Sequence, residues 1–178
     1  MSDEELKFFR SLEDVKVVFD VGARDNTEYL EIRPEAEYHL FEPNIEFFNK
    51  LKDKVGDKKN VHLNNFGIGD TNGNFTYFVT AQSFEGGEYQ NQKGDSVVYP
   101  MKRLDDYIEE HKIEKIDFLK LDTEGWDYRI IAGNPRAIEI SQNIQYEYWN
   151  DRGEFHILED RFNMEYIGQR NVVCKRKK

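Results

Sequence analysis

The sequence predicts an α/β fold built on a mostly parallel sheet with an antiparallel terminal strand. Three short hydrophobic runs, at residues 17–22, 38–43 and 116–125, each end in an acidic residue. Runs this apolar, bounded by turn residues, are typical of buried strands in a parallel sheet. Helical patterns alternate with the strands and a hairpin comes last, which is the order expected for parallel crossovers followed by an antiparallel edge.

The first part of the chain should alternate helices and strands. We expect a helix at 4–12, a strand at 15–21, a helix at 26–32, a strand at 37–41, a helix at 44–55 and a strand at 61–66. Pro34 should stop the second helix, because proline disfavours helical geometry in the residue before it. Asn44 and Gly56 are typical boundary residues for the third helix.

The pattern changes after a predicted turn at 67–70. Residues 72–100 should form an antiparallel excursion near the binding face, with β-rich runs at 75–80 and 96–99 and a candidate lid around Gly86-Gly87. Beyond it we expect a helix at 103–111, the central strand at 116–121, a helix at 126–132 closed by Gly133-Asn134-Pro135, a strand at 143–148, a helix at 154–162 and two strands within 164–173. No repeat or linker divides the chain, so a single domain over residues 1–178 is predicted.

Composition narrows the class of protein. The formal net charge of -10 argues against sequence-independent binding of nucleic acid, which needs basic side chains. No apolar stretch approaches the roughly 20 residues that span a bilayer. The single cysteine, Cys174, cannot form an internal disulfide, and the acidic N-terminus does not resemble a signal peptide. We expect a cytoplasmic protein, and nothing in the sequence predicts a protein partner.

Acidic residues follow several of the predicted strands. Ligands of open α/β sheets bind outside the carboxyl ends of the strands. The residues that should converge there are Asp20, Glu42, Asp122 and Glu124. A site surrounded by carboxylates favours a cationic, hydroxyl-rich ligand over a polyphosphate.

The spacing of Gly22 and Glu42 suits a nucleotide cofactor whose ribose hydroxyls bind an acidic residue. NAD would need a glycine-rich turn against its pyrophosphate, whereas residues 22–26 contain one glycine with Asp20 and Asp25 nearby. S-adenosylmethionine has the ribose and adenine but no phosphate, and its sulfonium and ammonium groups suit nearby acids. We therefore favour S-adenosylmethionine, with an NAD-binding oxidoreductase as the alternative. Asp20 and Gly22 could also simply end a strand.

These segments resemble the FkbM family of S-adenosylmethionine-dependent methyltransferases. The resemblance covers about residues 15–150 and rests on residues 19–23, 40–43, 65–73, 103–107 and 118–125, with the last segment the most specific and continuing into 130–133. It implies a Rossmann-like, three-layer class I methyltransferase fold with a seven-stranded sheet. It also implies O-methylation of a hydroxyl, in this family often on sugars or natural products.

The resemblance also assigns the cofactor residues. It implies that Asp20 and Gly22, with Ala23 and Arg24 in the same turn, lie near the methionine part, that Glu42 binds the ribose, and that Asn65 and Phe66 lie near the adenine. Arg24 and Asn26 stand where the family usually has Asn and Gly. Asn26 can adopt the left-handed conformation that glycine would supply. Arg24 could bind the methionine carboxylate or alter the pocket.

Methyl transfer to an alcohol needs a group that accepts the hydroxyl proton. Glu124 is the candidate base, and Asp122 would orient substrate or cofactor. Alternatively, Glu124 caps the following helix, because acids favour helix N-termini. A divalent metal could also acidify the hydroxyl, but two carboxylates are a sparse ligand set, so no metal is predicted. Lys120 should pair with these acids or lie as a buried, paired cation.

The acceptor should meet the end of the strand at 143–148. Glu147, Tyr148 and Trp126 are the candidate substrate residues, with aromatic faces suited to a small-molecule or glycan hydroxyl acceptor. Core packing is the alternative for the aromatic residues, and it should hold for Tyr146 or Trp149. His39 is expected to be a satisfied core residue, and His62, His111 and His156 offer no pairing. A non-catalytic module that only binds a cofactor or a partner is a further alternative.

Overall fold

A computed structural model describes residues 3–79, 95–148, 156–168 and 170–178 of the chain. Within these residues, seven strands form one sheet in the order β3-β2-β1-β7-β8-β10-β9. The strands are β1 (Val17–Val21), β2 (Glu37–Phe41), β3 (Val61–Asn64), β7 (Ile116–Leu121), β8 (Ser141–Glu147), β9 (Phe162–Ile167) and β10 (Asn171–Arg176). All pairings from β3 to β8 are parallel, and β10 runs antiparallel to both of its neighbours. The predicted α/β class with an antiparallel terminal strand is confirmed.

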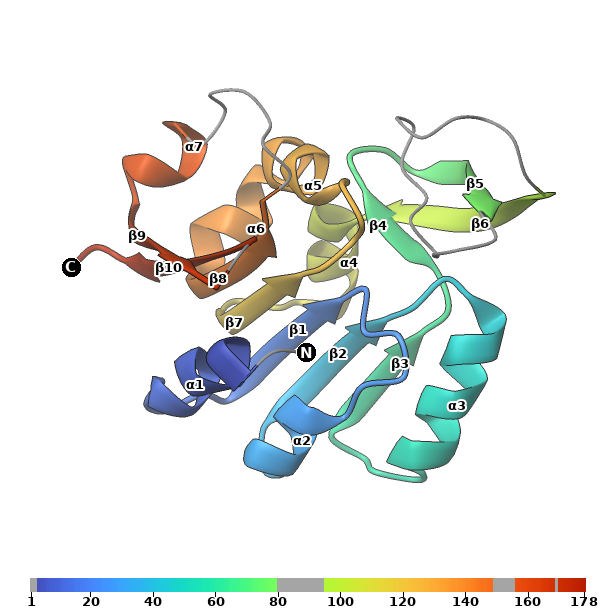
Figure 1. Cartoon of the computed structure of the whole chain (residues 1–178), viewed down its shortest axis with the longest axis horizontal. Helices are drawn as coiled ribbons and strands as arrows, with labels where there is room; N and C mark the ends of the chain where they lie inside the picture. The colour runs from blue at the N-terminus through green and yellow to red at the C-terminus, as the bar shows by residue number, and fades with distance from the viewer. Residues whose placement is uncertain (1–2, 80–94, 149–155, 169) are drawn as a thin grey trace.

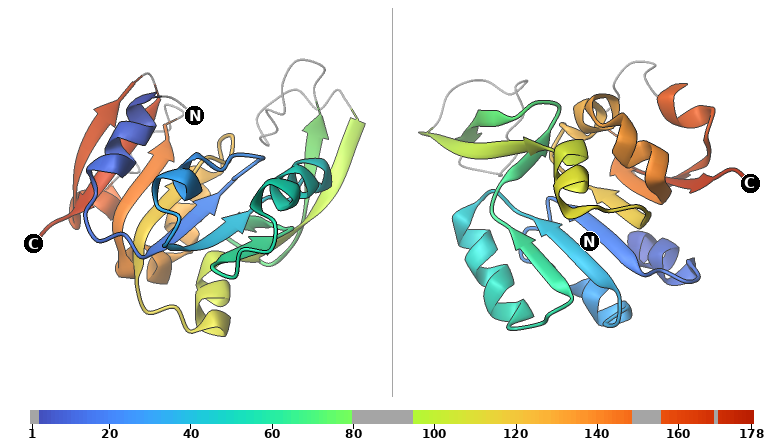
Figure 2. Two further views of the ribbon diagram at one scale, coloured as in Figure 1. Left: turned by 90° about the horizontal axis from the view of Figure 1, so that it is seen from below. Right: turned by 180° about the vertical axis from the view of Figure 1, so that it is seen from behind.

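Helices cover both faces of this sheet and complete three layers (Figures 1 and 2). On one face are α1 (Asp3–Ser11), α2 (Glu28–Ile32) and α3 (Ile45–Val55), and on the other are α4 (Leu104–His111), α5 (Asp127–Gly133) and α6 (Pro135–Ile140). A short helix, α7 (His156–Glu159), precedes β9. Among the described residues, no helix is long and apolar enough to cross a membrane.

Each face of the sheet has its own apolar core. Phe9 of α1 packs on Phe118 of β7 with ring centroids 4.9 Å apart on one face, and Tyr107 of α4 packs on Phe41 of β2 at 4.9 Å on the other. Strands buried on both faces explain why the sequence shows continuous apolar runs instead of alternation. Every residue of β7 is buried.

A second, three-stranded sheet stands beside the first (Figure 1). It consists of β4 (Gly67–Gly69), β5 (Gly73–Val79) and β6 (Asp95–Arg103), with β5 and β6 antiparallel and β4 parallel to β6. The predicted antiparallel excursion therefore exists in its described part, but it forms a sheet of its own instead of extending the main one. The candidate lid around Gly86-Gly87 lies outside the described residues.

The prediction of a turn at 67–70 is wrong, because Gly67–Gly69 is strand β4. Glycine is required at positions 67 and 69 because neighbouring side chains pack directly against the backbone there, and not because the chain turns. A Cβ on Gly67 would lie 2.8 Å from Cε1 of Phe75, and one on Gly69 would overlap Sδ of Met101. Both constraints come from residues distant in the sequence, so local turn chemistry misidentified the segment.

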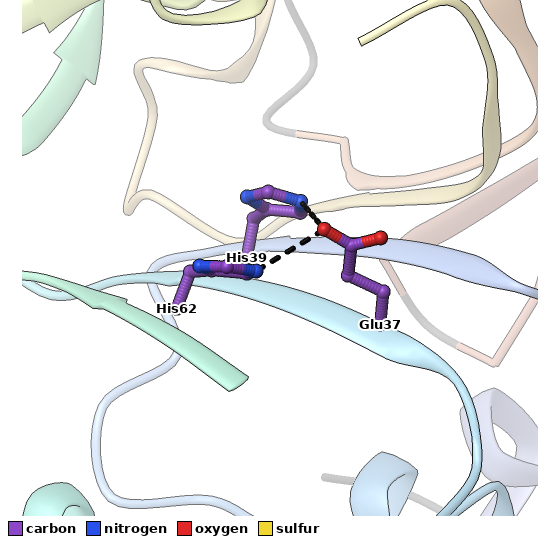
Figure 3. Close-up of side chains that lie close together, drawn as sticks. All are labelled: Glu37, His39 and His62. Carbon is purple, nitrogen blue, oxygen red and sulfur yellow. Dashed lines mark hydrogen bonds and ion pairs between the residues drawn. The ribbon is translucent and has the colours of Figure 1, made fainter. Parts of the chain in front are cut away.

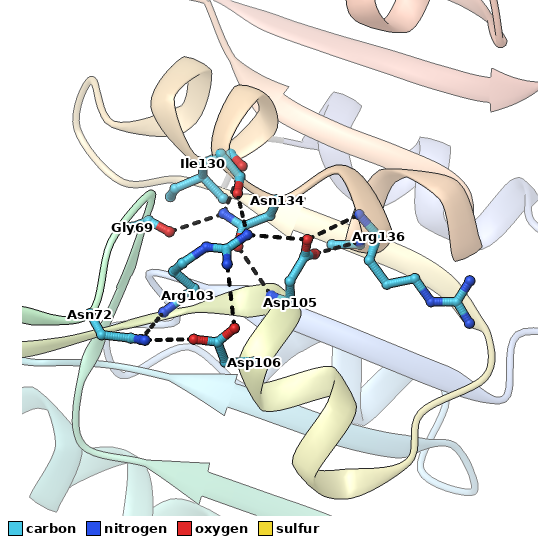
Figure 4. A network of polar contacts seen from close by, with 10 residues as sticks. Gly69, Asn72, Arg103, Asp105, Asp106, Ile130, Asn134 and Arg136 are labelled. Carbon is cyan, nitrogen blue, oxygen red and sulfur yellow. Dashed lines mark hydrogen bonds and ion pairs between the residues drawn. The ribbon is translucent and has the colours of Figure 1, made fainter.

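A polar network anchors the second sheet to the helices (Figure 4). Asn134 Nδ2 donates to the carbonyl oxygens of Gly69 at 2.9 Å and Ile130 at 2.8 Å. Arg103, at the end of β6, donates through Nη2 to the Gly133 carbonyl at 2.9 Å. Asp105 then accepts from the backbone N–H of residue 136 at 3.1 Å and of residue 137 at 2.8 Å.

That last pair of hydrogen bonds explains a helix that the sequence pattern missed. Pro135 is the first residue of α6, whereas the prediction had it close the preceding helix. Proline is favoured at the first helical position, because an N–H at that position would have no partner within the helix. Asp105 satisfies two of the free N–H groups that follow. The helix predicted at 154–162 was also too long: its described part is α7, and β9 already begins at Phe162.

Candidate active site

A cavity of about 240 Å³ opens at the carboxyl ends of β1, β2 and β7. Strand order reverses between β1 and β7, which is where open α/β sheets bind their ligands. The wall formed by the main sheet includes Gly22, Arg24, Glu42, Asp122 and Glu124. The opposite wall includes Ile68, Phe75, Tyr99 and Met101 from the second sheet, with Trp126 between the two.

Glu42 lines the cavity directly after β2 and is 6% exposed. Its Oε2 accepts from the backbone N–H of Arg24 at 2.9 Å, and its Oε1 from that of Asn44 at 2.7 Å. Burial raises the pKa of Glu42 to about 7; these two N–H groups and the Arg24 charge oppose the shift, and Asp20 adds to it. Each oxygen keeps further lone pairs, so the carboxylate can still accept from a pair of hydroxyls.

Gly22 turns the chain out of β1 against the exit of β7. Its φ is +82°, and a Cβ there would overlap the carbonyl oxygen of Asp122. Its N–H donates to the carbonyl of Phe41 at 3.0 Å. Only glycine allows the two strand ends to approach this closely.

Arg24 has the left-handed conformation in this turn, with φ 52°. Asn26, which could also adopt this conformation, is not among the described residues with positive φ. The hydrogen bond from the Arg24 N–H to Glu42 holds this geometry, and the guanidinium lies 4.7 Å from the ring centroid of Phe47. A non-glycine residue held in this region is common at ligand sites, where surrounding contacts maintain it.

Lys120 joins two of the predicted acids. Its Nζ lies 3.4 Å from Asp20 Oδ1 and 3.0 Å from Asp122 Oδ2, which confirms the expected pairing. Burial opposes the charge of Lys120, yet Asp122 and Asp20 raise its pKa well above the ordinary value. The Lys120 charge in turn lowers the pKa of Asp122, whereas burial raises that of Asp20.

Asp20 is 2% exposed and is not among the described residues that line the cavity. The expected convergence of four carboxylates is therefore reduced to three, namely Glu42, Asp122 and Glu124. The reason is local: Asp20 is one residue short of the strand end, so its side chain stays in the sheet and faces Lys120. Asp20 contributes to the site indirectly, because it pairs with Lys120, and Lys120 pairs with Asp122.

The loop after β7 has an unusual backbone. Glu124 has φ 54° and Gly125 φ 100°, so the chain reverses quickly between β7 and α5. Asp127, buried at the start of α5, accepts from Thr123 Oγ1 at 2.7 Å and from the Glu147 N–H at 3.3 Å. Burial raises the pKa of Asp127 to about 6. Sequence reasoning missed Asp127, although an acid in the first turn of a helix was the available signal.

Three of the predicted cofactor residues are not among the described residues that line the cavity. Ala23 is fully buried and donates its N–H to Phe41 at 3.1 Å. Asn65 donates through Nδ2 to the carbonyls of Glu42 at 2.9 Å and Pro43 at 3.1 Å, which fixes the segment that carries Glu42. Phe66 packs against Phe41 with ring centroids 5.8 Å apart. Direct contact of these three with a cofactor stays a prediction.

Aromatic side chains form the opposite wall. Phe75 lies 5.8 Å from Tyr99 and 5.7 Å from Trp126 between ring centroids. The guanidinium of Arg129, which pairs with Asp70 at 3.0 Å, lies 4.2 Å from the Trp126 ring. Trp126 was predicted; Phe75 and Tyr99 were not, although they lie in aromatic β-rich runs that the sequence showed.

The other two candidate substrate residues end β8 beside this region. Arg170 Nη1 lies 3.9 Å from Glu147 Oε1, and the Tyr148 ring packs edge-on against Tyr166 at 5.8 Å. Neither is among the described residues that line the cavity, so their role stays a prediction. Tyr146 is 2% exposed and belongs to the core, which agrees with the alternative prediction that an aromatic residue of this strand packs in the core. Trp149 lies outside the described residues.

The described histidine rings gather near α4, away from the cavity lining. His39 is buried as expected, with Nδ1 2.8 Å from the Tyr107 hydroxyl. It is not fully satisfied, because its buried Nε2 has no hydrogen-bond partner among the described residues. The expectation that His62 and His111 have no partner is wrong. His62 Nε2 lies 3.1 Å from Glu37 Oε1, and His111 Nδ1 lies 3.0 Å from the Tyr107 carbonyl.

Known proteins share both the sequence pattern and the fold. Residues 20–171 match the family described as the methyltransferase FkbM domain. The 2-O-methyltransferase NoeI of Sinorhizobium fredii (strain NBRC 101917 / NGR234) is 24% identical, and the alignment covers 74% of this chain and 63% of that protein. The chain thus spans less than two thirds of this relative.

Solved structures match at lower identity. The rRNA methylase from Streptococcus thermophilus superposes with a TM-score of 0.55 at 12% identity and covers 98% of this chain and 95% of its own. The Streptococcus mutans protein SMU.1697c, in complex with SAH, gives 0.56 at 11% identity, with 99% and 100% covered. Together with the sheet order, these structures establish the class I methyltransferase fold.

Proposed function

The chain belongs to the FkbM methyltransferase family, and from that premise we propose that it is an S-adenosylmethionine-dependent O-methyltransferase acting on a hydroxyl of a small molecule or glycan. When bound, S-adenosylmethionine supplies a methyl group on a sulfonium: an oxygen nucleophile would form a bond to the methyl carbon in line while the carbon–sulfur bond breaks and the sulfur leaves as the neutral thioether of the demethylated product. The observation that carries the proposal is the placement of Glu42 in the cavity beside the turn at Gly22.

The cavity suits the donor in shape and charge. Glu42 offers a carboxylate with free lone pairs for the two ribose hydroxyls, and the turn at Gly22 lets a ligand approach the backbone closely. Asp122 and Glu124 give the same wall a negative lining, which attracts a sulfonium and an ammonium. Arg24 in the same lining is the candidate for the methionine carboxylate.

Proton removal falls to Glu124 in this proposal. Lys120 lowers the pKa of Asp122, so that carboxylate is a weak base and suits an orienting role. Glu124 follows two residues later and also lines the cavity. A positioned base of this kind contributes about 10²–10⁴-fold to a proton-transfer step.

The aromatic wall favours a ring-shaped acceptor. Contact with the ring faces of Phe75, Tyr99 and Trp126 would hold the acceptor opposite the donor. Methyl transfer needs the reacting atoms at a near-attack distance of about 3–3.5 Å. Sugar rings stack on such faces, and the similarity to a 2-O-methyltransferase supports a glycan hydroxyl. Glu147 and Tyr148 are proposed to contact the outer part of the acceptor.

The test is methyl transfer from labelled S-adenosylmethionine to a panel of mono- and oligosaccharides and non-sugar alcohols, with the methylated atom located by mass spectrometry. We expect an O-methyl ether whose formation is lost in Glu124→Gln while binding of the demethylated product is kept. Binding without turnover on any acceptor would favour a non-catalytic module. Tighter binding of NAD than of S-adenosylmethionine would overturn the proposal in favour of an oxidoreductase.

A further inference from the structure

Three potential metal ligands converge at the far end of β2 from the cavity (Figure 3). Glu37 and His39 are two residues apart on β2 and therefore share a face of the sheet. His62 of β3 pairs in register with His39 and points the same way. One ligand atom from each of the three residues lies within 4.8 Å of the other two.

The inner ligand atom has no hydrogen-bond partner among the described residues. His39 is 1% exposed, and its Nε2 is buried and unsatisfied. Glu37 Oε1 lies 3.3 Å from this atom but outside hydrogen-bonding geometry. A buried, unpaired nitrogen is unfavourable, because it has lost its water without gaining a partner.

We propose that Glu37, His39 and His62 bind a divalent transition-metal ion of the Zn²⁺ type. Ligand atoms of a tetrahedral zinc ion, each about 2.0–2.1 Å from the metal, lie about 3.3 Å from one another. The Glu37 oxygen lies 3.3 Å from His39 Nε2 and 3.1 Å from His62 Nε2, which matches that spacing.

The surroundings supply what such a site needs. With an ion on Nε2, the remaining ring proton of His39 sits on Nδ1 and is donated to the Tyr107 hydroxyl 2.8 Å away, the outer-shell bond typical of metal-binding histidines.

Binding requires one movement. The His39 and His62 rings are stacked within 14° of parallel, with centroids 4.6 Å apart, so one ring must tilt for both nitrogens to point at one ion. The His62 side chain is 43% exposed and has room to do so, as does that of Glu37 at 46%. The same exposure leaves a fourth position for water.

The ion would have a structural role and not a catalytic one. β2 runs from Glu37 to Phe41 before it reaches Glu42 at the cavity, so the two sites lie at opposite ends of one strand. An ion there would join β2 to the edge strand β3 and, through Tyr107, to α4. Two imidazoles and one carboxylate suit Zn²⁺ better than Mg²⁺, which prefers oxygen ligands.

The test is calorimetric titration of untagged, chelator-treated protein with ZnCl₂, with CoCl₂ absorption to report tetrahedral geometry. We expect one ion per chain and a higher thermal unfolding temperature when it is bound. His62→Gln and Glu37→Gln change exposed side chains, should fold, and should abolish stoichiometric binding. Tyr107→Phe should weaken binding by about 10–100-fold.

His156→Gln is the matched control, because it removes a histidine at the opposite edge of the sheet, and it should bind Zn²⁺ as the unchanged protein does. Absence of Zn²⁺ binding would overturn the proposal. So would stoichiometric binding that survives both His62→Gln and Glu37→Gln, or binding of Mg²⁺ with equal affinity. None of these readouts depends on methyl transfer, so failure of this site leaves the proposed activity untouched.

Discussion

Cofactor binding should depend on pH through the buried carboxylate of Glu42, which lines the cavity. The ionised form accepts from two backbone N–H groups and keeps lone pairs for two ribose hydroxyls. Protonation places a hydrogen on an oxygen that already accepts one hydrogen bond, so the protonated form binds the ribose poorly. Because burial raises the pKa of Glu42 to about 7, this change falls near neutrality. Affinity should increase as the pH rises through this value.

The size of the effect follows from the ionised fraction. With a pKa of about 7, about a tenth of Glu42 is ionised at pH 6 and about nine tenths at pH 8, so the apparent affinity should rise about tenfold across that range. Glu42→Gln should remove the dependence. It should also weaken binding by about 10–100-fold, because a hydrogen bond to a charged group contributes about 1.5–3 kcal/mol.

The assay is calorimetric titration with adenosine, which carries the ribose hydroxyls but lacks the amino-acid amine of the full cofactor, whose own titration near pH 8 would confuse the profile. Glu46→Gln is the matched control, because Glu46 is an exposed carboxylate on α3 that is not among the described residues lining the cavity. It should keep the full pH dependence. A flat profile in the unchanged protein, or a slope that persists in Glu42→Gln, would refute the role given to Glu42.

Three further changes test the site and its support. Gly22→Ala should abolish cofactor binding and lower the unfolding temperature, because its Cβ would overlap Asp122, whereas Gly56→Ala, also at positive φ but with open space around it, should keep binding. Lys120→Met should cost about 3–5 kcal/mol in urea unfolding by leaving Asp20 buried without its cation, and adding Asp20→Asn should recover part of the loss. Glu124→Gln should lower kcat by about 10²–10⁴-fold without changing the cofactor Kd; equal loss in both would assign Glu124 to binding.

The parts of the fold that local chemistry decides were predictable from the sequence. The bounds of β2 and β7 were predicted to the residue, because each is a buried apolar run closed by an acid and a turn. Asn44 was correctly placed as a cap, and its Oδ1 accepts from the Glu46 N–H at 2.9 Å. The placement of Glu42 and Glu124 in one cavity followed from the rule that ligands bind at strand ends.

The parts that depend on distant contacts were not predictable. Gly67 and Gly69 have turn-like composition, and only the packing of Phe75 and Met101 against them shows that they form a strand. The contribution of Tyr99 to the cavity likewise depends on how the second sheet docks. Arg24, and not Asn26, adopts the left-handed conformation, and the Glu42 carboxylate beyond β2 accepts a hydrogen bond from its N–H.

The anchor between the second sheet and the helices has a consequence for how this chain should tolerate substitutions in the second sheet. The side chains of Arg103 and Asn134 donate hydrogen bonds to the main-chain oxygens of Gly133, Gly69 and Ile130. A backbone oxygen is present whatever side chain a position carries. The wall proposed to face the acceptor could therefore exchange its side chains while its attachment to the helices is kept. The residues proposed to bind the donor, such as Gly22 and Glu42, lie outside this sheet, so under the proposed function a change of acceptor would leave the donor half of the cavity intact.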